Sequence, residues 1–547
     1  MPGMKFALVQ MNPTVGAVEN NAAQIVRWAR EAAAAGADAA VFPELALCGY
    51  PPDDLVLRPR FMDAVDAAAE RLAAELPPEL LSIVGAPMRG EGRLYNAALL
   101  FQGGRRTAAA NKMRLPNYGV FDERRLFAPG AEPLVFDCGG ARLAVHICED
   151  SWWPEGEAFR GLKGRCDVLV NLSASPYCRG REGDREEMAR KAVAAAGAPM
   201  LYTNLVGGQD ELVFDGGALA VGTDGEVAAR SGLFAEGMLL VEVKEAGGRW
   251  APAPGRRDPM PEPLEEVYEA LKTGLRDYVN KNGFPGVLVA LSGGIDSALV
   301  AAIAADALGK ERVFGVTLPS AITSTETLAD ALDLAARLGI PCLKIPIAPA
   351  VEAFAALLGP ACADVTWANP LPGTLMEENL QARIRGVLVM ALSNRYGHMV
   401  VTTGNKSEMA TGYATLYGDM AGGFALIKDV PKTLVFELAR WRNRRGEVIP
   451  PSTISRPPSA ELKPGQLDSD SLPPYEVLDP ILEQYVERQA GVRDILASGA
   501  DEAVVRRVIR MVDRSEYKRR QGAPGVKITP KAFGRDRRMP ITNGFRE

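Results

Sequence analysis

A six-residue stretch, Ser-Gly-Gly-Ile-Asp-Ser at 292–297, is the strongest constraint on how this chain folds. It follows the apolar run 287–291 and precedes the alanine-rich run 298–308, an order that predicts a buried strand, a tight turn and a helix. Two glycines let the backbone approach a phosphate closely, and the start of a helix offers free N–H groups. The serine hydroxyls add donors, and Asp296 is placed to hold Mg²⁺ beside the phosphates. The Gly-Lys-Ser/Thr ending of a Walker A loop is absent, and a plain structural turn is the alternative interpretation.

The residues around this loop predict alternating strands and helices. A helix is expected over 263–280, and Thr323-x-x-Glu326 has the pattern of a capping box for a helix that ends near Gly339. Further short apolar runs predict strands at 313–317, 342–345 and 399–403. We therefore expect a parallel sheet covered on both faces, with its ligand at the carboxyl ends of the strands.

The first 245 residues show a similar alternation and predict one layered α/β domain. A helix is expected over 20–35. The expected strands are 6–10, 39–42, 81–85, 95–101, 143–147, 168–172, 200–202, 219–221 and 238–243. Residues 246–262 are rich in Gly, Pro and Arg without hydrophobic periodicity, so we expect a linker there and a second domain over 263–547.

Composition excludes some functional classes. A chain of 547 residues is long enough for two or more domains, and its net charge of −6 gives no sign of nucleic-acid binding. Seven cysteines without a Cys-x-x-Cys pair favour a reducing, cytoplasmic location over a disulfide scaffold. The N-terminus lacks the apolar segment of a signal peptide, and no apolar run reaches the length of a membrane span. With only two histidines, catalysis must depend mainly on other groups.

Three residues at strand ends or in loops have the chemistry of an amide-cleaving site. Cys148 is a candidate nucleophile, which needs thiolate character, and the ammonium group of Lys112 would lower its pKa if it lay nearby. Glu44 could take the thiol proton and later activate water. Each residue alone is more simply a core, surface or cap residue, but their joint local contexts favour catalysis. The other cysteines of this half, Cys48, Cys138, Cys166 and Cys178, lack such a context, and we expect structural roles for them.

Those local contexts resemble the nitrilase superfamily, in particular the glutaminase branch attached to NAD synthetases. The matching stretches are Phe-Pro-Glu-Leu at 42–45, Asn-Lys with Leu-Pro-Asn-Tyr-Gly-Val-Phe-Asp-Glu at 111–123, and Ile-Cys-Glu-Asp at 147–150. The resemblance implies an α-β-β-α sandwich in which Glu44 is the general base, Lys112 stabilises the tetrahedral intermediate and Cys148 forms a γ-glutamyl thioester. It also implies that Tyr118, Ser173 and Arg181 hold glutamine and that Glu123 is a second, orienting glutamate, although Arg181 fits surface charge equally well.

The second half resembles the ATP-pyrophosphatase domain of the same enzymes, an adenine nucleotide alpha hydrolase-like fold that splits ATP into AMP and pyrophosphate. By that resemblance, ATP is bound by Ser292, Gly293, Gly294, Ile295, Asp296, Ser297 and Thr403, and Mg²⁺ by Asp296 and Glu408. The dinucleotide site is expected to involve Asn379, Arg383, Asp419, Lys432 and Lys518. Asn379 and Arg383 lie four residues apart on one helix face, which could also be a solvated face.

Over nearly its whole length, the chain resembles the glutamine-dependent NAD synthetases. The expected substrates are therefore deamido-NAD, ATP and glutamine, with no nucleic-acid or membrane partner, and family members are often homo-oligomers. Other enzymes with this ATP loop fit less well: GMP synthetase uses a Cys-His-Glu glutaminase, and asparagine synthetase uses an N-terminal cysteine. A simple amidase would not need residues 263–547, and a non-catalytic nucleotide sensor would not need both sets of motifs intact.

Overall fold

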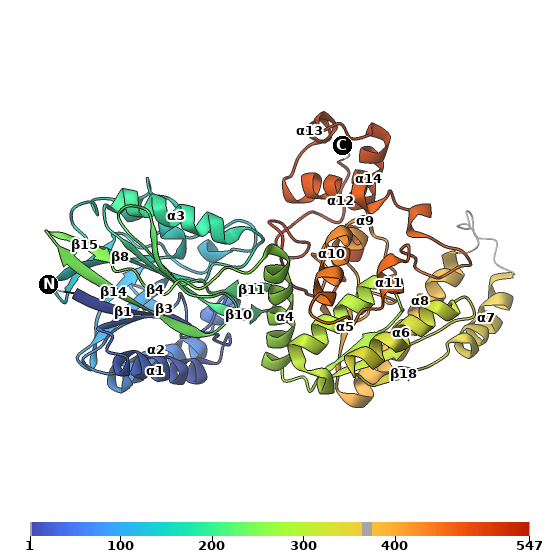
Figure 1. The fold of residues 1–547 in the computed structure, drawn as a ribbon, viewed down its shortest axis with the longest axis horizontal. Coiled ribbons are helices and arrows are strands. Elements are labelled where there is room, and N and C mark those ends of the chain that lie inside the picture. Colours follow the sequence, from blue (N-terminus) through green and yellow to red (C-terminus); the bar gives the residue numbers. More distant parts are fainter. Residues whose placement is uncertain (1–2, 364–374, 546–547) are drawn as a thin grey trace. The chain divides into compact units, whose positions relative to one another are not determined.

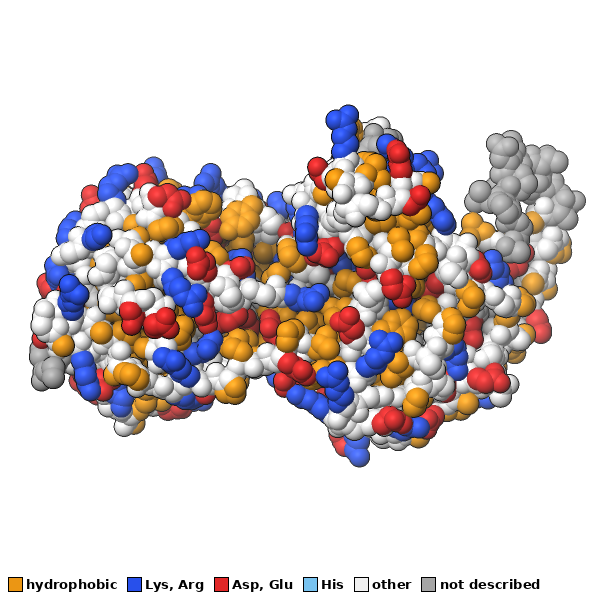
Figure 2. Space-filling model, turned by 45° about the horizontal axis from the view of Figure 1, so that its top comes forward, with side chains coloured by type: hydrophobic (Ala, Val, Ile, Leu, Met, Phe, Trp, Pro, Cys, Tyr) orange, Lys and Arg blue, Asp and Glu red, His pale blue; other side chains and the backbone are white. Residues whose placement is uncertain are grey.

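The computed structural model describes residues 3–363 and 375–545. The chain forms two compact units, Met1–Pro263 and Leu264–Glu547, each with its own sheets and helices (Figure 1). Among the described helices, none has both the length and the apolar character that a membrane span requires. Lys, Arg, Asp and Glu side chains are interspersed over the face that Figure 2 shows.

The first unit contains two large sheets. In spatial order, the seven-stranded sheet contains β15 (Arg249–Pro252), β14 (Gly237–Ala246), β1 (Gly3–Gln10), β2 (Ala39–Val41), β3 (Leu81–Gly90), β4 (Arg93–Gln102) and β5 (Arg105–Asn111). The six-stranded sheet contains β13 (Val227–Arg230), β12 (Leu219–Val221), β9 (Met200–Asn204), β8 (Val168–Ser173), β7 (Ala141–Ile147) and β6 (Leu134–Cys138). A separate hairpin is formed by β10 (Val206–Gln209) and β11 (Leu212–Asp215).

Alternating side chains of β1 show how this unit is layered. Ala7 and Val9 pack in a core with α1 (Val18–Ala34) and α2 (Pro59–Glu75), whereas Phe6 and Leu8 pack between the two sheets. On the other side of the sandwich, α3 (Arg181–Ala196) packs against the six-stranded sheet. Because successive strand residues point to opposite faces, one apolar strand serves two cores. The expected α-β-β-α sandwich is confirmed, and Figure 1 shows these helices on its two outer faces.

The segment expected to be a linker begins with regular structure. Strand β15 pairs antiparallel with β14, which places Arg249–Pro252 at the edge of the seven-stranded sheet. Four residues of the expected linker therefore form a strand of the first unit. Ala246 and Arg249 pair across a Gly-Gly turn at 247–248, in which both glycines have positive φ. A Gly-Gly turn between two strands is itself a hairpin signal.

The second unit is built on one parallel sheet. Its strands, in spatial order, are β18 (Cys342–Lys344), β17 (Val313–Thr317), β16 (Val287–Ala290), β19 (Met399–Thr402) and β20 (Phe424–Ala425). Its helices are α4 (Pro263–Lys281), α5 (Ile295–Leu308), α6 (Thr325–Leu338), α7 (Ala348–Ala363), α8 (Leu375–Tyr396), α9 (Lys406–Thr411), α10 (Lys432–Asn443), α11 (Pro451–Ser455), α12 (Tyr475–Leu482), α13 (Val492–Ala497), α14 (Glu502–Arg514) and α15 (Glu516–Arg519). The expected parallel sheet is confirmed.

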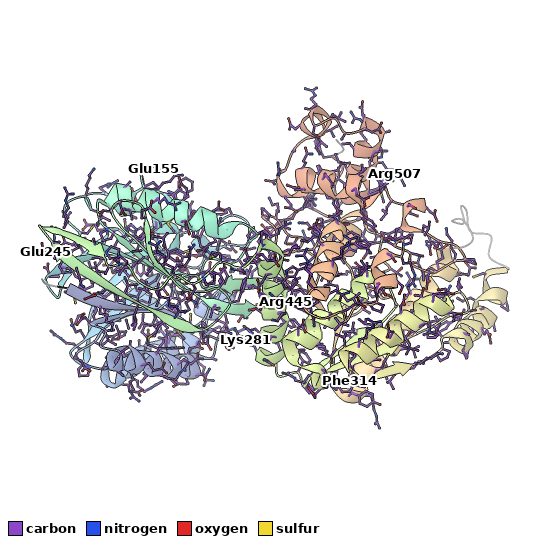
Figure 3. All side chains as sticks on the ribbon, in the orientation of Figure 1. Glu155, Glu245, Lys281, Phe314, Arg445 and Arg507 are labelled. Atoms are coloured by element: carbon purple, nitrogen blue, oxygen red, sulfur yellow. The ribbon has the colours of Figure 1, made fainter. Side chains whose placement is uncertain are left out.

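Helices cover this sheet and extend beyond it. Ile384 and Val389 of α8 pack against Leu288 and Val400 of the sheet. A further core unites α12, α13 and α14 with Phe533 near the C-terminus. Arg445, labelled in Figure 3, follows α10 and pairs with Glu265 of α4 at 2.5 Å.

The start of α6 differs from the expected capping box. Ser324 is the N-cap, because its hydroxyl accepts a hydrogen bond from the main-chain N–H of Thr327 at 3.1 Å. The Thr323 hydroxyl instead accepts from the N–H of Ser320. The assignment of the cap to Thr323 is therefore wrong by one residue, because α6 begins at Thr325 and the residue directly before its first turn is Ser324.

Candidate active sites

In the first unit, three buried side chains converge from both sheets. Glu44 and Lys112 follow β2 and β5 of the seven-stranded sheet, whereas Cys148 follows β7 of the six-stranded sheet. Their relative exposures are 1%, 0% and 5%. Residues separated by more than 100 positions along the chain therefore share one site because the two sheets stack face to face.

The Lys112 ammonium group lies between two carboxylates. Its Nζ donates to Glu44 Oε1 at 2.6 Å and to Glu123 Oε1 at 2.8 Å, and the Tyr50 hydroxyl also donates to Glu123 at 2.9 Å. Burial acts to lower the pKa of Lys112, but the charges of Glu123 and Glu44 outweigh burial, so this pKa is raised. Lys112 is therefore held as a cation in an interior position, where it can stabilise developing negative charge.

Hydrogen bonds fix the orientation of the Glu44 carboxylate. Its Oε1 accepts from Asn96 Nδ2 at 2.7 Å, and its Oε2 accepts from the main-chain N–H of Ala174 at 2.8 Å. Ala174 follows β8, so the second bond joins the two sheets. A carboxylate held in this way is preorganised as a proton acceptor.

Cys148 occupies a constrained turn at the end of β7. Its φ of +44° is in the left-handed region, where a residue with a Cβ is disfavoured, and the chain passes directly into a short 3₁₀-helix, Cys148–Trp152. Burial raises the pKa of the thiol, the charge of Glu44 raises it further, and Lys112 opposes both. A thiol of this kind needs an adjacent base to become a nucleophile, which is the arrangement that Glu44 provides.

The residues expected to hold glutamine lie around the cysteine. The Tyr118 hydroxyl donates to both carboxylate oxygens of Glu149 at 3.0 Å, and the pKa of this phenol is raised by burial and by Glu149. Ser173, at the end of β8, donates to Asn171 Oδ1 at 2.7 Å. The Arg181 guanidinium lies over the ring of Trp152 at 4.3 Å, so it is not simply solvated.

Sequence reasoning did not single out three residues that shape this site. Glu149 accepts from Tyr118 and from Trp153 Nε1, and Asp150 accepts main-chain hydrogen bonds on both sides of the cluster. Both directly follow Cys148, so the Cys-Glu-Asp sequence was an available signal. Asn96 lies within β4 and had no comparable signal.

A cavity of about 290 Å³ lies at the carboxyl ends of the parallel strands in the second unit. Its walls include all six residues of the glycine-rich loop, Thr403 after β19, and Glu408, Asp419 and Lys432. Within the loop, Ser297 Oγ accepts from the N–H of Ser292 at 3.2 Å, and Ser292 Oγ accepts from that of Gly294 at 3.2 Å. This position, where α5 begins, is the expected one for binding phosphates.

Two carboxylates and one ammonium group meet in this cavity. Lys432 Nζ donates to Asp296 Oδ2 at 2.5 Å and lies 3.5 Å from Glu408 Oε1. Asn405 Nδ2 donates to Asp296 Oδ1 at 2.9 Å, and its N–H donates to Glu408 Oε2 at 3.2 Å. Burial and the nearby Asp296 raise the pKa of Glu408 to about 8.

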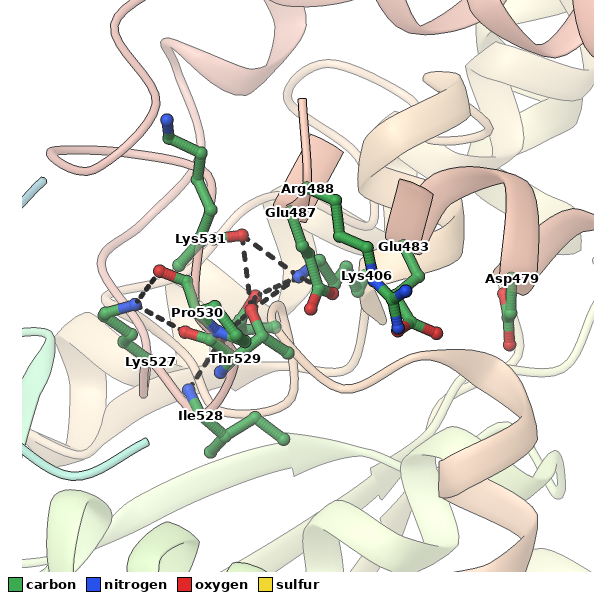
Figure 4. A network of polar contacts seen from close by, with 12 residues as sticks. Lys406, Asp479, Glu483, Glu487, Arg488, Lys527, Ile528, Thr529, Pro530 and Lys531 are labelled. Carbon is green, nitrogen blue, oxygen red and sulfur yellow. Dashed lines mark hydrogen bonds and ion pairs between the residues drawn. The ribbon is translucent and has the colours of Figure 1, made fainter. Parts of the chain in front are cut away.

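Helix α9, which carries Glu408, is anchored through its first residue, Lys406, by a buried polar network (Figure 4). Lys406 Nζ donates to Glu487 Oε1 at 2.7 Å, to Thr529 Oγ1 at 2.6 Å and to the carbonyl of Lys531 at 3.1 Å. Asp429 lies 2.9 Å from the same ammonium group and accepts from the N–H of Thr529. The C-terminal segment thus stabilises the helix that presents Glu408.

Three other expected dinucleotide contacts lie outside the lining of this cavity. Asn379 Oδ1 accepts from Thr415 Oγ1, Arg383 Nε donates to the carbonyl of Leu416, and Lys518 Nζ donates to the carbonyls of Gly412 and Ala414. All three therefore converge on the segment 412–419, whose last residue, Asp419, does line the cavity. The cavity is also lined by four charged residues that were given no role from the sequence, Arg385, Arg456, Glu461 and Asp468.

Comparisons with known proteins match both halves of the chain. The carbon-nitrogen hydrolase family model matches residues 5–252, and the NAD synthase model matches residues 267–522. The chain is 45% identical to the glutamine-dependent NAD(+) synthetase of Synechocystis sp., covering 99% of each, and 44% identical to that of Thermotoga maritima, covering 100% of each.

Solved structures give the same picture. The glutamine-dependent NAD(+) synthetase of Acinetobacter baumannii, determined in complex with adenosine diphosphate, is 41% identical, with 99% of each chain covered and a TM-score of 0.79. The enzyme of that name from Cytophaga hutchinsonii has a TM-score of 0.84 over 99% of this chain and 98% of its own, at 22% identity, which shows the shared fold.

Proposed function

The chain belongs to the family of glutamine-dependent NAD(+) synthetases, and on that premise we propose which residues carry each part of the reaction. The protein is an ATP-dependent carbon-nitrogen ligase with glutamine as amide donor, and it converts deamido-NAD to NAD. We assign glutamine hydrolysis to residues 1–245 and amide formation to residues 263–547, joined through 246–262. The observation that carries the first assignment is the buried convergence of Glu44, Lys112 and Cys148.

In the glutaminase half, Glu44 removes the thiol proton of Cys148 as the sulfur attacks the amide carbon of glutamine. The ammonium group of Lys112 stabilises the negative charge that develops on the amide oxygen, because it is held as a cation close by. Glu44 then returns the proton to the leaving ammonia, which leaves a γ-glutamyl thioester on Cys148. Attack by water, activated by Glu44, releases glutamate and regenerates the thiol.

Glutamine itself would be held by polar groups around Cys148. Tyr118, Ser173 and Arg181 are proposed for this role, with Glu149 as a carboxylate partner for the α-ammonium group. The support is that Tyr118 donates to Glu149 and that Arg181 is fixed against Trp152 rather than free in solvent. Glu123 would orient Lys112 without contacting the substrate.

In the synthetase half, the loop 292–297 and Thr403 bind ATP, and the carboxylate of deamido-NAD attacks the α-phosphate. This step makes an adenylate and releases pyrophosphate, converting a poor leaving group into a good one. Lys432, between two carboxylates in the cavity, would stabilise charge on the phosphates. The ADP complex of the Acinetobacter baumannii relative supports a nucleotide site of this kind. Ammonia then attacks the activated carbon, giving NAD and AMP.

We assign the magnesium ion of this half to Asp296 and Glu408. Within the described part of the chain, no group of three or more acidic, His or Cys side chains is arranged to hold a metal. The two carboxylates nevertheless fit, because their oxygens already converge on one cation, the Lys432 ammonium group, and Mg²⁺ commonly takes one or two carboxylates together with substrate phosphates. When bound, the ion would neutralise charge on the departing pyrophosphate.

The dinucleotide is assigned to Asn379, Arg383, Asp419, Lys432 and Lys518. Except for Lys432, these residues hold or belong to the segment 412–419, so they would act by shaping one wall of the site.

Ammonia must reach this site as NH₃, since ammonium has no lone pair, and a protected passage from Cys148 would keep it unprotonated. Assembly into a homo-oligomer is part of the same proposal.

The test is NAD formation from deamido-NAD, ATP and Mg²⁺ by the parent protein and Cys148→Ala, each supplied with glutamine or with ammonium at raised pH. We expect the variant to lose glutamine-driven synthesis and keep ammonium-driven synthesis. If Cys148→Ala still uses glutamine, the nucleophile is misassigned. If the parent makes no NAD from either nitrogen source, the assignment of amide formation to residues 263–547 is wrong.

A further inference from the structure

Asp150 joins the two parts of the glutaminase site through main-chain hydrogen bonds. Its Oδ1 accepts from the N–H groups of Met113 at 3.0 Å and Arg114 at 2.7 Å, and its Oδ2 accepts from the N–H of Ile147 at 3.1 Å. Met113 directly follows Lys112, and Ile147 directly precedes Cys148. One carboxylate, 3% exposed, therefore bonds to the neighbours of both residues.

Lys112 and Cys148 are held by different sheets. Lys112 follows β5 at the edge of the seven-stranded sheet, and Cys148 follows β7 of the six-stranded sheet. Hydrogen bonds within either sheet cannot set the separation between them, because that separation depends on how the sheets stack. Glu44 also bonds across the sheets, to Ala174, but it changes its protonation state during the proposed reaction. Asp150 instead uses both oxygens on main-chain donors.

The position of Asp150 has a cost that a purely stabilising residue would not carry. Burial raises the pKa of Asp150 to about 6, although the hydrogen bonds from Arg114 and Ile147 and the charge of Lys112 act in the opposite direction. Compared with water, these surroundings favour the protonated form of Asp150 over the carboxylate. Keeping the carboxylate ionised in the folded protein therefore lowers the free energy of unfolding. Residues kept at such an expense are typically those that a functional site requires.

We propose that Asp150 is a positioning residue of the glutaminase reaction, which fixes the separation between the thiol of Cys148 and the ammonium group of Lys112 by holding the two chain segments together. This inference rests on the proposed roles of those two residues. Both carboxylate oxygens of Asp150 accept main-chain N–H groups, so the proposal gives Asp150 no contact with the substrate. A misplacement on the scale of 1 Å in a catalytic group costs on the order of 10²-fold in rate.

The test uses the full-length protein with Asp150→Asn, whose side chain has the same shape but only one acceptor oxygen. The amide NH₂ group then faces either the N–H of Ile147 or those of Met113 and Arg114, so one segment is released. We expect kcat for glutamine hydrolysis to fall about 10²-fold while the KM for glutamine stays within a few-fold of that of the parent. Ammonium-driven NAD synthesis should be unchanged, which shows that the variant is folded.

The matched control is Asp167→Asn. Asp167, directly before β8, also accepts a main-chain hydrogen bond, from Arg142 at 2.8 Å, and it pairs with the Arg142 guanidinium. Arg142 lies at the start of β7, whereas Cys148 follows the end of that strand. Its loss should leave glutamine hydrolysis unaffected. An unchanged kcat in Asp150→Asn, or a rise in KM alone, would overturn the positioning role.

If Asp150→Asn also loses ammonium-driven synthesis, Asp150→Glu decides the matter. Glutamate keeps the charge and both acceptors but is longer by one methylene. A folded Asp150→Glu with low kcat supports positioning, whereas parent-like kcat, or loss of both activities again, overturns it. Cys148→Ala in the same assay separates this result from a failure of the proposed function, since only that variant tests the nucleophile.

Discussion

The Lys432 ammonium nitrogen lies 2.5 Å from Asp296 Oδ2, although the two residues are 136 positions apart in the chain. Asp296 is in the first turn of α5, and Lys432 is the first residue of α10. The charges of Asp296 and Glu408 outweigh the effect of burial, so the pKa of Lys432 is raised and the residue stays cationic. Two helix starts therefore present opposite charges to the same cavity.

Asp296→Asn should abolish amide formation without affecting glutamine hydrolysis. The amide cannot neutralise Lys432 and is a weak ligand for Mg²⁺, so we expect NAD synthesis from glutamine and from ammonium to fall at least about 10²-fold. Glutamate release from glutamine, measured separately, should persist. Asp333→Asn, which removes an exposed ion pair with Arg337, is the control and should leave both activities intact. Parent-like synthesis by Asp296→Asn would contradict the assignment.

Gly293→Ala should destabilise the phosphate loop, whereas Gly294→Ala should not. Gly293 has φ of +83°, and a Cβ there would lie 2.1 Å from the carbonyl oxygen of Thr327. The left-handed backbone alone costs roughly 1–2 kcal/mol. Gly294 has φ of −86°, and its Cβ would approach only Ser292 Oγ, at 3.3 Å. Thermal unfolding should show a lower Tm for the first variant only, and equal Tm values would argue against this loop geometry.

Mg²⁺ binding should strengthen as the pH rises from 4.5 toward 8. The pKa of Glu408 is raised from 4.5 to about 8, mainly by burial, so the folded protein holds this proton over a window in which the unfolded chain has lost it. Without metal, the contribution of Glu408 to stability therefore falls as the pH rises through that window. Mg²⁺ must displace the proton, so its binding should release one.

The measurement for this prediction is the Mg²⁺ concentration that gives half-maximal ammonium-driven synthesis, at several pH values. Glu408→Gln should need more Mg²⁺ and lose the part of the pH dependence that comes from this proton. Glu447→Gln, at an exposed ion pair in the same unit, is the control. A Mg²⁺ requirement in Glu408→Gln that matches the parent at every pH would contradict the assignment of Glu408 as a Mg²⁺ ligand.

Glutamine hydrolysis should weaken as the pH falls through about 7. Burial raises the pKa of Glu123 to about 7 against the opposing effect of Lys112, so below that pH the carboxyl becomes neutral and Lys112 loses one of its two anionic partners. In Glu123→Gln, kcat for glutamine hydrolysis should be lower at every pH and should no longer fall as the pH drops through about 7. Glu157→Gln, at an exposed pair with Arg160, should keep the parent profile. An acid limb that survives in Glu123→Gln must come from another group.

Much of the fold was predictable because the signals are local. The apolar runs at 6–10 and 313–317 become β1 and β17, and the Gly-Gly turn at 293–294 does begin a helix. Strand β5 was missed because its sequence, Arg-Arg-Thr-Ala-Ala-Ala-Asn, has neither alternation nor β-branched enrichment. It is a strand because β4 pairs with it along the sheet edge.

The candidate sites were likewise predictable from the sequence only in part. The sequence by itself determined the residue types: a cysteine, a lysine and a glutamate in recognisable motifs, and an acidic glycine-rich loop before a helix. Only the tertiary structure decided that Lys112 bonds Glu44 and Glu123 together, that Lys432 pairs with Asp296, and that Asp150 joins the segments of Lys112 and Cys148. The physical reason is that periodicity and turn chemistry act over a few residues, whereas the separation of side chains on different sheets is set by the packing of whole layers.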